Sequence, residues 1–220
     1  MAKVGRKKDF RFRESKDRNV LRTVAITGFL TKSYVMSEGF SEGRADWLFA
    51  SKYVEEAPRS YIESAEKAGL YKEPVYVLTS DGRERAAALL GITRCYSRQN
   101  YKHDARVQEE YLKLTPSERE RCITEDQTAR NHKAKWERDL RSEEADVREE
   151  AEYSLRLLRN GLISPPDFSY TQTETVVEDG VERTIEVEIG VEVMVGYKDS
   201  DKIKKYGFCD RAGMEGRYIH

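Results

Sequence analysis

The chain begins with a segment whose side chains can bind phosphate. Nine basic residues fall within the first 22 positions against three acidic ones: Lys3, Arg6, Lys7, Lys8, Arg11, Arg13, Lys16, Arg18 and Arg22. Clustered cations of this kind neutralise nucleic-acid phosphates. We expect residues 1–18 to form a flexible basic arm along a DNA backbone; the alternative is a solvated tail. Because Phe10 and Phe12 are its only large apolar side chains, we expect the arm to add little to a core.

The rest of the chain does not share this basic character. The net charge is −1, and residues 137–152 are rich in acid. Charged residues make up 36% and hydrophobic residues 38%, a balance too apolar for disorder in a chain long enough to bury a core. These proportions favour a folded protein that contacts nucleic acid at one end only.

The metal-binding and redox residue types are scattered. Cys95, Cys122 and Cys209 show neither metal-ligand nor disulfide spacing, and His103, His132 and His220 do not cluster with them. We therefore expect reduced thiols and no cofactor. No apolar run reaches the length of a membrane span, and no signal-peptide stretch follows the basic segment. The sequence predicts a cytoplasmic protein that does not bind membranes.

The order of predicted elements in residues 19–92 is typical of a winged-helix domain. Apolar residues recur at helical spacing over 20–30, Thr31 caps a short helix, and 38–46 is predicted as a loop. A helix over 58–68 ends at Gly69, a strand covers 74–78, and Thr79 starts a helix that Gly91 ends. The alternative is an unrelated helix–strand–helix fragment. The apolar patch at 47–53 is not assigned.

In a winged helix the third helix lies in the major groove. We expect Arg59, Ser60 and Glu63 to face the bases, with Lys67 at the end of the same helix. Phosphate contacts are predicted for side chains of the wing, the following helix and the arm: Lys72, Arg83, Arg85, Arg6, Lys7, Lys8, Arg11 and Arg13.

The second half changes from helical to strand periodicity. Residues 93–162 are predicted as a helical connector, with a capping box at Thr115 and Glu118 and one long helix over 126–160. Residues 163–220 are predicted to be β-rich: a hairpin turn at 179–180, a strand over 183–195 with strict period two, and a short helix over 202–206. The fold class is therefore α+β.

Four segments together resemble the plasmid replication-relaxation family, winged-helix proteins of plasmids and integrative elements. They are Ala68-Gly69-Leu70 with Leu78-Thr79-x-x-Gly82; KHDARV from Lys102; WERDLR from Trp136; and PPDFSY from Pro165 followed by IEVEI from Ile185. Their order and spacing over residues 19–206 carry the resemblance. It implies a restriction-endonuclease-type α/β core after the winged helix.

The resemblance also implies a metal-binding position in that core. Asp167 with Glu186 or Glu188 would hold Mg²⁺ and activate water. The sequence departs from the active pattern after Glu188, where Gly190 and Glu192 follow and no lysine stands on the strand. We therefore expect a degenerate nuclease fold without catalysis.

Taken together, these patterns predict a DNA-binding protein of a mobile genetic element. It would bind double-stranded DNA at an origin of transfer or replication, or at its own promoter; a relaxase, a replication protein or a host defence protein is a further candidate partner. A second possibility is a protein-binding inhibitor or nucleic-acid mimic acting on a host defence enzyme. The predicted recognition helix is not very basic, and its few positive residues are flanked by Glu55, Glu56, Glu63 and Glu66. The third is a metal-dependent nuclease. Oligomeric state is left open.

Overall fold

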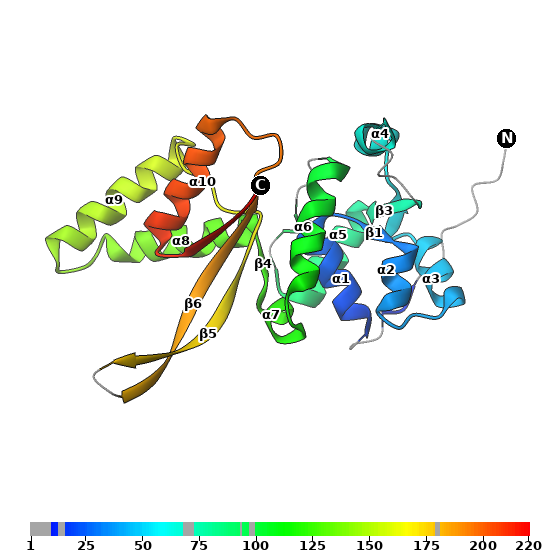
Figure 1. Cartoon of the computed structure of the whole chain (residues 1–220), viewed down its shortest axis with the longest axis horizontal. Helices are drawn as coiled ribbons and strands as arrows, with labels where there is room; N and C mark the ends of the chain where they lie inside the picture. The colour runs from blue at the N-terminus through cyan, green and yellow to red at the C-terminus, as the bar shows by residue number, and fades with distance from the viewer. Residues whose placement is uncertain (1–9, 13–15, 68–72, 93, 97–99, 179–180) are drawn as a thin grey trace. The chain divides into compact units, whose positions relative to one another are not determined.

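The protein is an α+β chain that divides into two compact units, Met1–Tyr111 and Leu112–His220, each with its own sheet (Figure 1). The computed structural model describes residues 10–12, 16–67, 73–92, 94–96, 100–178 and 181–220. The division falls within one helix, α6 (Tyr101–Lys113). The segment expected to be a separate helical connector, 93–162, is therefore shared between the two units.

The first unit combines helices with a small antiparallel sheet. Its elements are α1 (Lys16–Thr27), β1 (Leu30–Thr31), α2 (Lys32–Ser37), α3 (Glu42–Phe49), β2 (Val54–Glu56), α4 (Arg59–Lys67), β3 (Val75–Leu78), α5 (Ser80–Leu90) and α6. The strands lie in the order β1-β3-β2, with Leu30 opposite Tyr76 and Val54 opposite Leu78. Helix α4 is thus part of the connection between β2 and β3.

Local capping follows the sequence prediction in this unit. The Thr31 and Thr79 side chains accept hydrogen bonds from the backbone N–H groups of Tyr34 and Gly82 and start α2 and α5. Helix α5 ends at Gly91, whose φ of 67° is a left-handed conformation that favours glycine. Gly69, predicted to end α4, lies outside the described residues.

The predicted loop at 38–46 is wrong from Glu42 onward, where α3 begins. Ala45 and Leu48, three positions apart, are both buried and hold this helix against the core. The unassigned apolar patch at 47–53 is the end of α3 together with the turn that leads to β2. The two glycines that suggested a loop do not prevent the helix: Gly43 stands on its open side, where a side chain would meet nothing within 4 Å.

The expectation that the N-terminal segment is a flexible arm is wrong for residues 10–12 and 16–18. Phe10 is only 2% exposed and belongs to the main core of the first unit, in ring contact with Phe12 and Trp47. The Arg44 guanidinium lies 4.6 Å from the centre of the Phe10 ring and forms an ion pair with buried Asp17. Two aromatic rings and one arginine therefore hold this segment in place.

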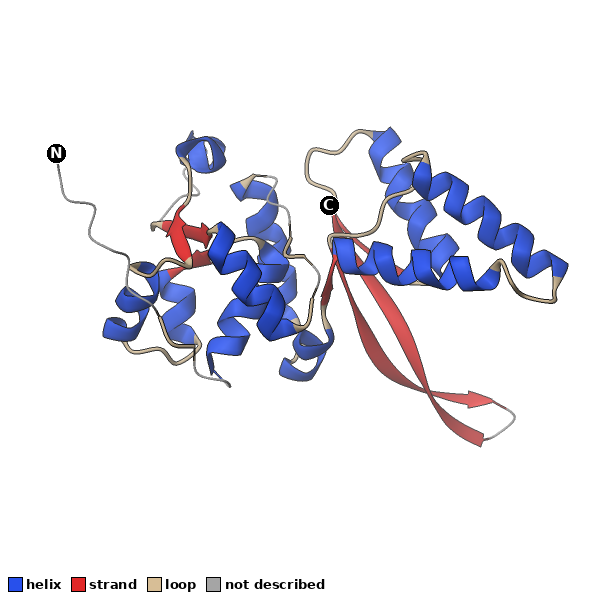
Figure 2. Cartoon of the chain, turned by 180° about the vertical axis from the view of Figure 1, so that it is seen from behind, coloured by secondary structure: helices blue, strands red, loops and turns tan. Residues whose placement is uncertain are grey.

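The second unit contains four strands and four further helices among its described residues. These are α7 (Pro116–Arg121), β4 (Ile123–Thr124), α8 (Glu125–Asp139), α9 (Ala145–Arg159), β5 (Phe168–Glu178), β6 (Val181–Val193), α10 (Asp199–Ala212) and β7 (Glu215–Ile219). The sheet order is β4-β5-β6-β7, and only β6 and β7 are parallel. Figure 2 shows the three long helices grouped at one end of the β5–β6 hairpin.

The long helix predicted over 126–160 is two helices. Helix α8 ends at Asp139, and α9 begins at Ala145 and packs against α8. This reversal lets Trp136 of α8 and Ala151 and Leu155 of α9 share one core with Phe208. A single helix would have left these apolar residues without a common core. The capping box at Thr115 and Glu118 is confirmed, and β7 was not predicted.

We expect Phe10→Ala to lower the free energy of unfolding by about 3–5 kcal/mol, because it removes a buried aromatic ring from a packed core. Urea denaturation of the full chain measures this. Arg11→Ala is the matched control: the Arg11 side chain is exposed, and we expect a change within about 0.5 kcal/mol. Equal stabilities for Phe10→Ala and the wild type would show that residues 10–12 do not dock on the core.

Candidate functional site

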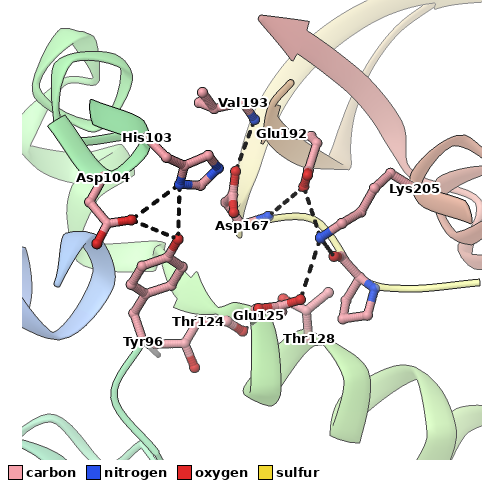
Figure 3. A network of polar contacts seen from close by, with 11 residues as sticks. Tyr96, His103, Asp104, Thr124, Glu125, Thr128, Asp167, Glu192, Val193 and Lys205 are labelled. Carbon is pink, nitrogen blue, oxygen red and sulfur yellow. Dashed lines mark hydrogen bonds and ion pairs between the residues drawn. The ribbon is translucent and has the colours of Figure 1, made fainter. Parts of the chain in front are cut away.

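Two buried carboxyl groups meet where β5 begins and β6 ends (Figure 3). Phe168 pairs with Val191, so Asp167, just before β5, lies beside Glu192. The backbone N–H of Asp167 donates to Oε2 of Glu192 at 3.0 Å, and the N–H of Val193 donates to Oδ2 of Asp167 at 2.9 Å. Both side chains are 0% exposed. Each carboxyl group thus binds the backbone of the opposite segment.

A lysine from the following helix completes this cluster. The Lys205 ammonium of α10 lies 3.2 Å from Oε2 of Glu192 and donates to the carbonyl oxygen of Pro165 at 2.6 Å. It also lies 3.4 Å from Oε1 of Glu125, at the start of α8. Figure 3 shows the lysine nitrogen between these oxygens. We call Asp167, Glu192, Lys205 and Glu125 the buried charge cluster.

Burial and mutual repulsion change the protonation of this cluster. Burial, together with the negative charge of Asp167, raises the pKa of Glu192 from its ordinary value of 4.5 to about 8. Lys205 and the Tyr197 hydroxyl act in the opposite direction but do not cancel this rise. Burial alone would lower the pKa of Lys205, but the carboxylates of Glu192, Glu125 and Asp167 raise it.

The expected metal group of Asp167 with Glu186 or Glu188 does not form. Glu188 bonds elsewhere: its carboxylate accepts from the Ser169 hydroxyl at 3.2 Å and lies 3.0 Å from Nε2 of His132. Glu186 lies opposite Thr173, further out along the hairpin, and is exposed. The prediction chose the wrong glutamates because the hairpin register, which sequence alone did not supply, brings Glu192 to Asp167.

The sequence analysis also missed Lys205. A lysine was sought on the strand, whereas the structure supplies one from α10, the helix after that strand. The signal was present, because the predicted short helix at 202–206 contains Lys205. Its burial was not apparent from the charged residues around it.

The buried charge cluster does not fit a divalent cation. Oδ2 of Asp167 and Oε2 of Glu192 already accept backbone hydrogen bonds, and the Lys205 ammonium lies 3.2 Å from Oε2 of Glu192, where it would repel a cation. Magnesium keeps several water ligands, and neither carboxyl group is exposed to water. The described part of the chain also contains no group of three or more His, Cys, Asp or Glu residues that could hold a metal ion. The geometry is that of a clamp joining β5, β6 and α10.

The residues expected to contact DNA are exposed wherever the structure describes them. On α4 these are Arg59, Ser60, Glu63 and Lys67, with Lys67 in an ion pair with Glu63 at 2.8 Å. On α5 the exposed pair is Arg83 and Arg85. Arg11 is exposed as well, whereas Lys72, Arg6, Lys7, Lys8 and Arg13 lie outside the described residues.

Helix α4 is anchored by a second buried polar group. The Tyr61 hydroxyl of α4 donates to Oδ2 of Asp104 on α6 at 2.7 Å. Oδ1 of the same carboxylate accepts from the Tyr96 hydroxyl at 3.2 Å and lies 3.1 Å from Nδ1 of His103 (Figure 3). Asp104, in the first turn of α6, thus also holds α4 in position so that the opposite face of α4 is exposed.

Comparisons of the chain with protein-family models, with curated proteins and with solved structures found no match. No helix within the described ranges combines the length and apolar character needed to cross a bilayer.

We expect Glu192→Gln to flatten the pH dependence of stability. Between pH 4.5 and about 8 the folded chain keeps a proton on Glu192 that the unfolded chain releases. The free energy of unfolding therefore falls as pH rises through this window, by on the order of 2–4 kcal/mol. Glutamine has no such proton. Urea denaturation at several pH values should show a steeper fall for the wild type than for Glu192→Gln. Glu186→Gln, an exposed change on the same strand, should follow the wild type; if all three curves are parallel, Glu192 is not protonated in the folded chain.

We also expect no cleavage of single- or double-stranded DNA in the presence of Mg²⁺ or Mn²⁺. The carboxyl groups of Asp167 and Glu192 are shielded from water and bonded to backbone. Phosphoryl transfer needs a metal and a positive group at an accessible phosphate. Incubation with supercoiled plasmid measures this. Metal-dependent nicking that disappears in both Asp167→Ala and Lys205→Ala would show that the cluster opens and is a nuclease centre.

Proposed function

We propose that the chain is a DNA-binding protein whose first unit is a winged helix. The observation that carries this proposal is the element order α1-β1-α2-α3-β2-α4-β3 together with the antiparallel strand order β1-β3-β2. Helices α1, α2 and α3 come before β2 and β3, and the connection between these two strands, which contains α4, occupies the place of the wing. Winged helices are variants of the helix-turn-helix and bind duplex DNA with a helix in the major groove.

This arrangement gives the recognition position to α3, with α4 inside the wing. The exposed acids of α3, Glu42 and Asp46, both bind Lys32, at 3.0 and 2.8 Å. The one arginine of α3, Arg44, turns inward to Asp17. Helix α3 therefore presents no cation that is available to phosphate.

Helix α4 is better suited to contact DNA. It exposes Arg59 near its start and, at its end, Lys67, whose ion pair with Glu63 is itself exposed to solvent; the bond between Tyr61 and Asp104 fixes the orientation of the helix. We propose that α4 supplies the cations for the DNA contact, with Arg83 and Arg85 of α5 as further phosphate ligands.

The resemblance to the plasmid replication-relaxation family adds a location for this binding: an origin of transfer or replication, or the chain's own promoter. The second unit supports the nuclease-like part of that resemblance by its residue types. An aspartate follows a proline at the start of one strand, an acidic residue lies on its antiparallel neighbour, and a lysine ammonium lies 3.2 Å from that residue. We propose that this unit is a degenerate nuclease core used for structure.

One observation favours a second candidate, a protein-binding inhibitor or nucleic-acid mimic. Helix α3, at the recognition position, exposes Glu42, Asp46 and Trp47 and no unpaired cation. An acidic face with an exposed tryptophan suits a basic protein surface better than a phosphate backbone. Salt dependence of DNA binding distinguishes the two candidates, because phosphate contacts weaken steeply as salt increases.

We expect Arg59→Ala with Lys67→Ala to lower affinity for duplex DNA roughly tenfold and to reduce the slope of log K against log salt by about two. The physical reason is the loss of two exposed cations from one helix. Gel shifts with random-sequence duplexes and with the region upstream of the chain's own gene, at several salt concentrations, measure both quantities.

The matched control is Lys133→Ala with Arg138→Ala, which removes the same charge from the exposed face of α8 in the second unit. We expect this variant to bind DNA as the wild type does. If the wild type binds neither DNA at low salt, the proposal of DNA binding fails and the protein-binding candidate replaces it. If the two double variants lose affinity equally, the contact is not on α4.

A further inference from the structure

The β5–β6 hairpin extends well beyond the rest of its sheet. Strand β4 pairs only with Phe168 and Ser169, and β7 pairs only with residues Ile189 to Val193. Residues 171–178 and 181–188 are therefore paired only with one another among the described residues. Figures 1 and 2 show this part projecting away from the three long helices of its unit. We call residues 171–178 and 181–188 the ribbon.

The two edges of the ribbon differ. On the β5 side, α7 packs against the strand, and the Arg121 guanidinium donates to the Thr173 hydroxyl at 3.4 Å. On the β6 side, the neighbouring strand β7 begins its pairing only at Ile189. Every second residue of an edge strand directs its backbone N–H and C=O outward. The open edge of β6 therefore offers a row of backbone donors and acceptors to an added strand.

The two faces of β6 along this edge carry different chemistry. Val181, Ile185 and Val187 lie on one face, and Val181 and Ile185 are 56% and 41% exposed. Arg183 lies on this face as well, between Val181 and Ile185. Glu182 and Glu186 lie on the opposite face, where their partners on β5 are Val177 and Thr173. A two-stranded ribbon is only marginally stable in water, so exposed β-branched residues here are costly unless a partner covers them.

The charge of the ribbon excludes two partners. In the part of the ribbon that projects beyond the sheet, the described acidic side chains are Glu174, Glu182 and Glu186. The one basic side chain described there is Arg183. This surface repels the phosphates of nucleic acid. It also opposes pairing with the ribbon of a second copy, because like charges on neighbouring strands destabilise a sheet.

We propose that the open edge of β6, residues 181–188, binds a basic protein segment as an added β-strand. The segment alternates Lys or Arg with Val or Ile. Its basic side chains lie beside Glu182 and Glu186, and its apolar side chains cover Val181, Ile185 and Val187. Backbone hydrogen bonds supply affinity, and the alternation of charge and apolar contact supplies specificity. This protein contact is separate from the proposed DNA surface and does not depend on it.

The test uses a fluorescent peptide of alternating lysine and valine with the full chain, read by anisotropy. A peptide with the same residues in two blocks, all lysines and then all valines, has equal charge but cannot place them on opposite faces of a strand. We expect the alternating peptide to bind at least about tenfold more tightly than the block peptide. Methylation of the backbone nitrogens of the alternating peptide that would face β6 should abolish this difference, because it removes the N–H donors of the hydrogen bonds between the two strands.

Two chain variants locate the contact. Glu182→Lys with Glu186→Lys should weaken binding of the alternating peptide about tenfold. Glu143→Lys with Glu149→Lys makes the same charge change at exposed positions near α9 and should leave it unchanged. Equal binding of alternating and block peptides, or equal loss in the two variants, would show attraction of charge alone and overturn the proposal. Absence of binding by the alternating peptide would also overturn it.

Discussion

The register between β5 and β6 is the constraint on which the second unit depends. Phe168 lies opposite Val191, and every pair outward to Glu178 and Val181 follows from that alignment. It places Asp167 beside Glu192, Glu188 near His132 and Ser169, and Glu182 and Glu186 on the free part of the hairpin. A shift by one residue would exchange the faces of β6 and direct Ile189 and Val191 away from the core. The clamp and the ribbon are thus two ends of the same pairing.

Buried charge has a structural use in both units. In the second unit, Lys205 lies among carboxyl groups that would otherwise repel one another, and burial raises the pKa of one of them, Glu192. In the first unit, Asp17 forms an ion pair with the arginine of α3, and Asp104 accepts a hydrogen bond from the hydroxyl group of Tyr61. Breaking one partner of such a group leaves an unpaired buried charge, which costs more than the bond itself contributes. These groups therefore fix the relative positions of the segments they join.

This use of charge bears on function. If the first unit is a winged helix as proposed, the one arginine of α3 is bound to Asp17, and the exposed cations of α4 are the ones left to contact DNA. In the second unit the carboxyl groups of Asp167 and Glu192 are closed to water, so a hydrated metal ion would reach them only if the cluster opened. In both units burial gives charged residues a structural task.

The sequence by itself determined the local elements, because their causes are local. Thr31, Thr79 and Thr115 cap helices wherever the following backbone N–H groups are free, and strict alternation over residues 185–193 specifies a strand in any surroundings. The α+β class followed from these elements. Helix capping and strand alternation depend on residues that are neighbours in the sequence and not on distant contacts.

Only the tertiary structure decided which residues meet. Phe10 joined the core because Trp47 and Arg44 lie against it, and the predicted long helix divided because α8 and α9 share one core. Asp167 lies beside Glu192 rather than Glu186 because of the hairpin register. Lys205, which contacts Glu192, lies 13 positions after it in the chain, on a helix. Such contacts depend on the alignment of segments distant in sequence. Many alignments satisfy the same local pattern, and packing of the whole unit selects among them.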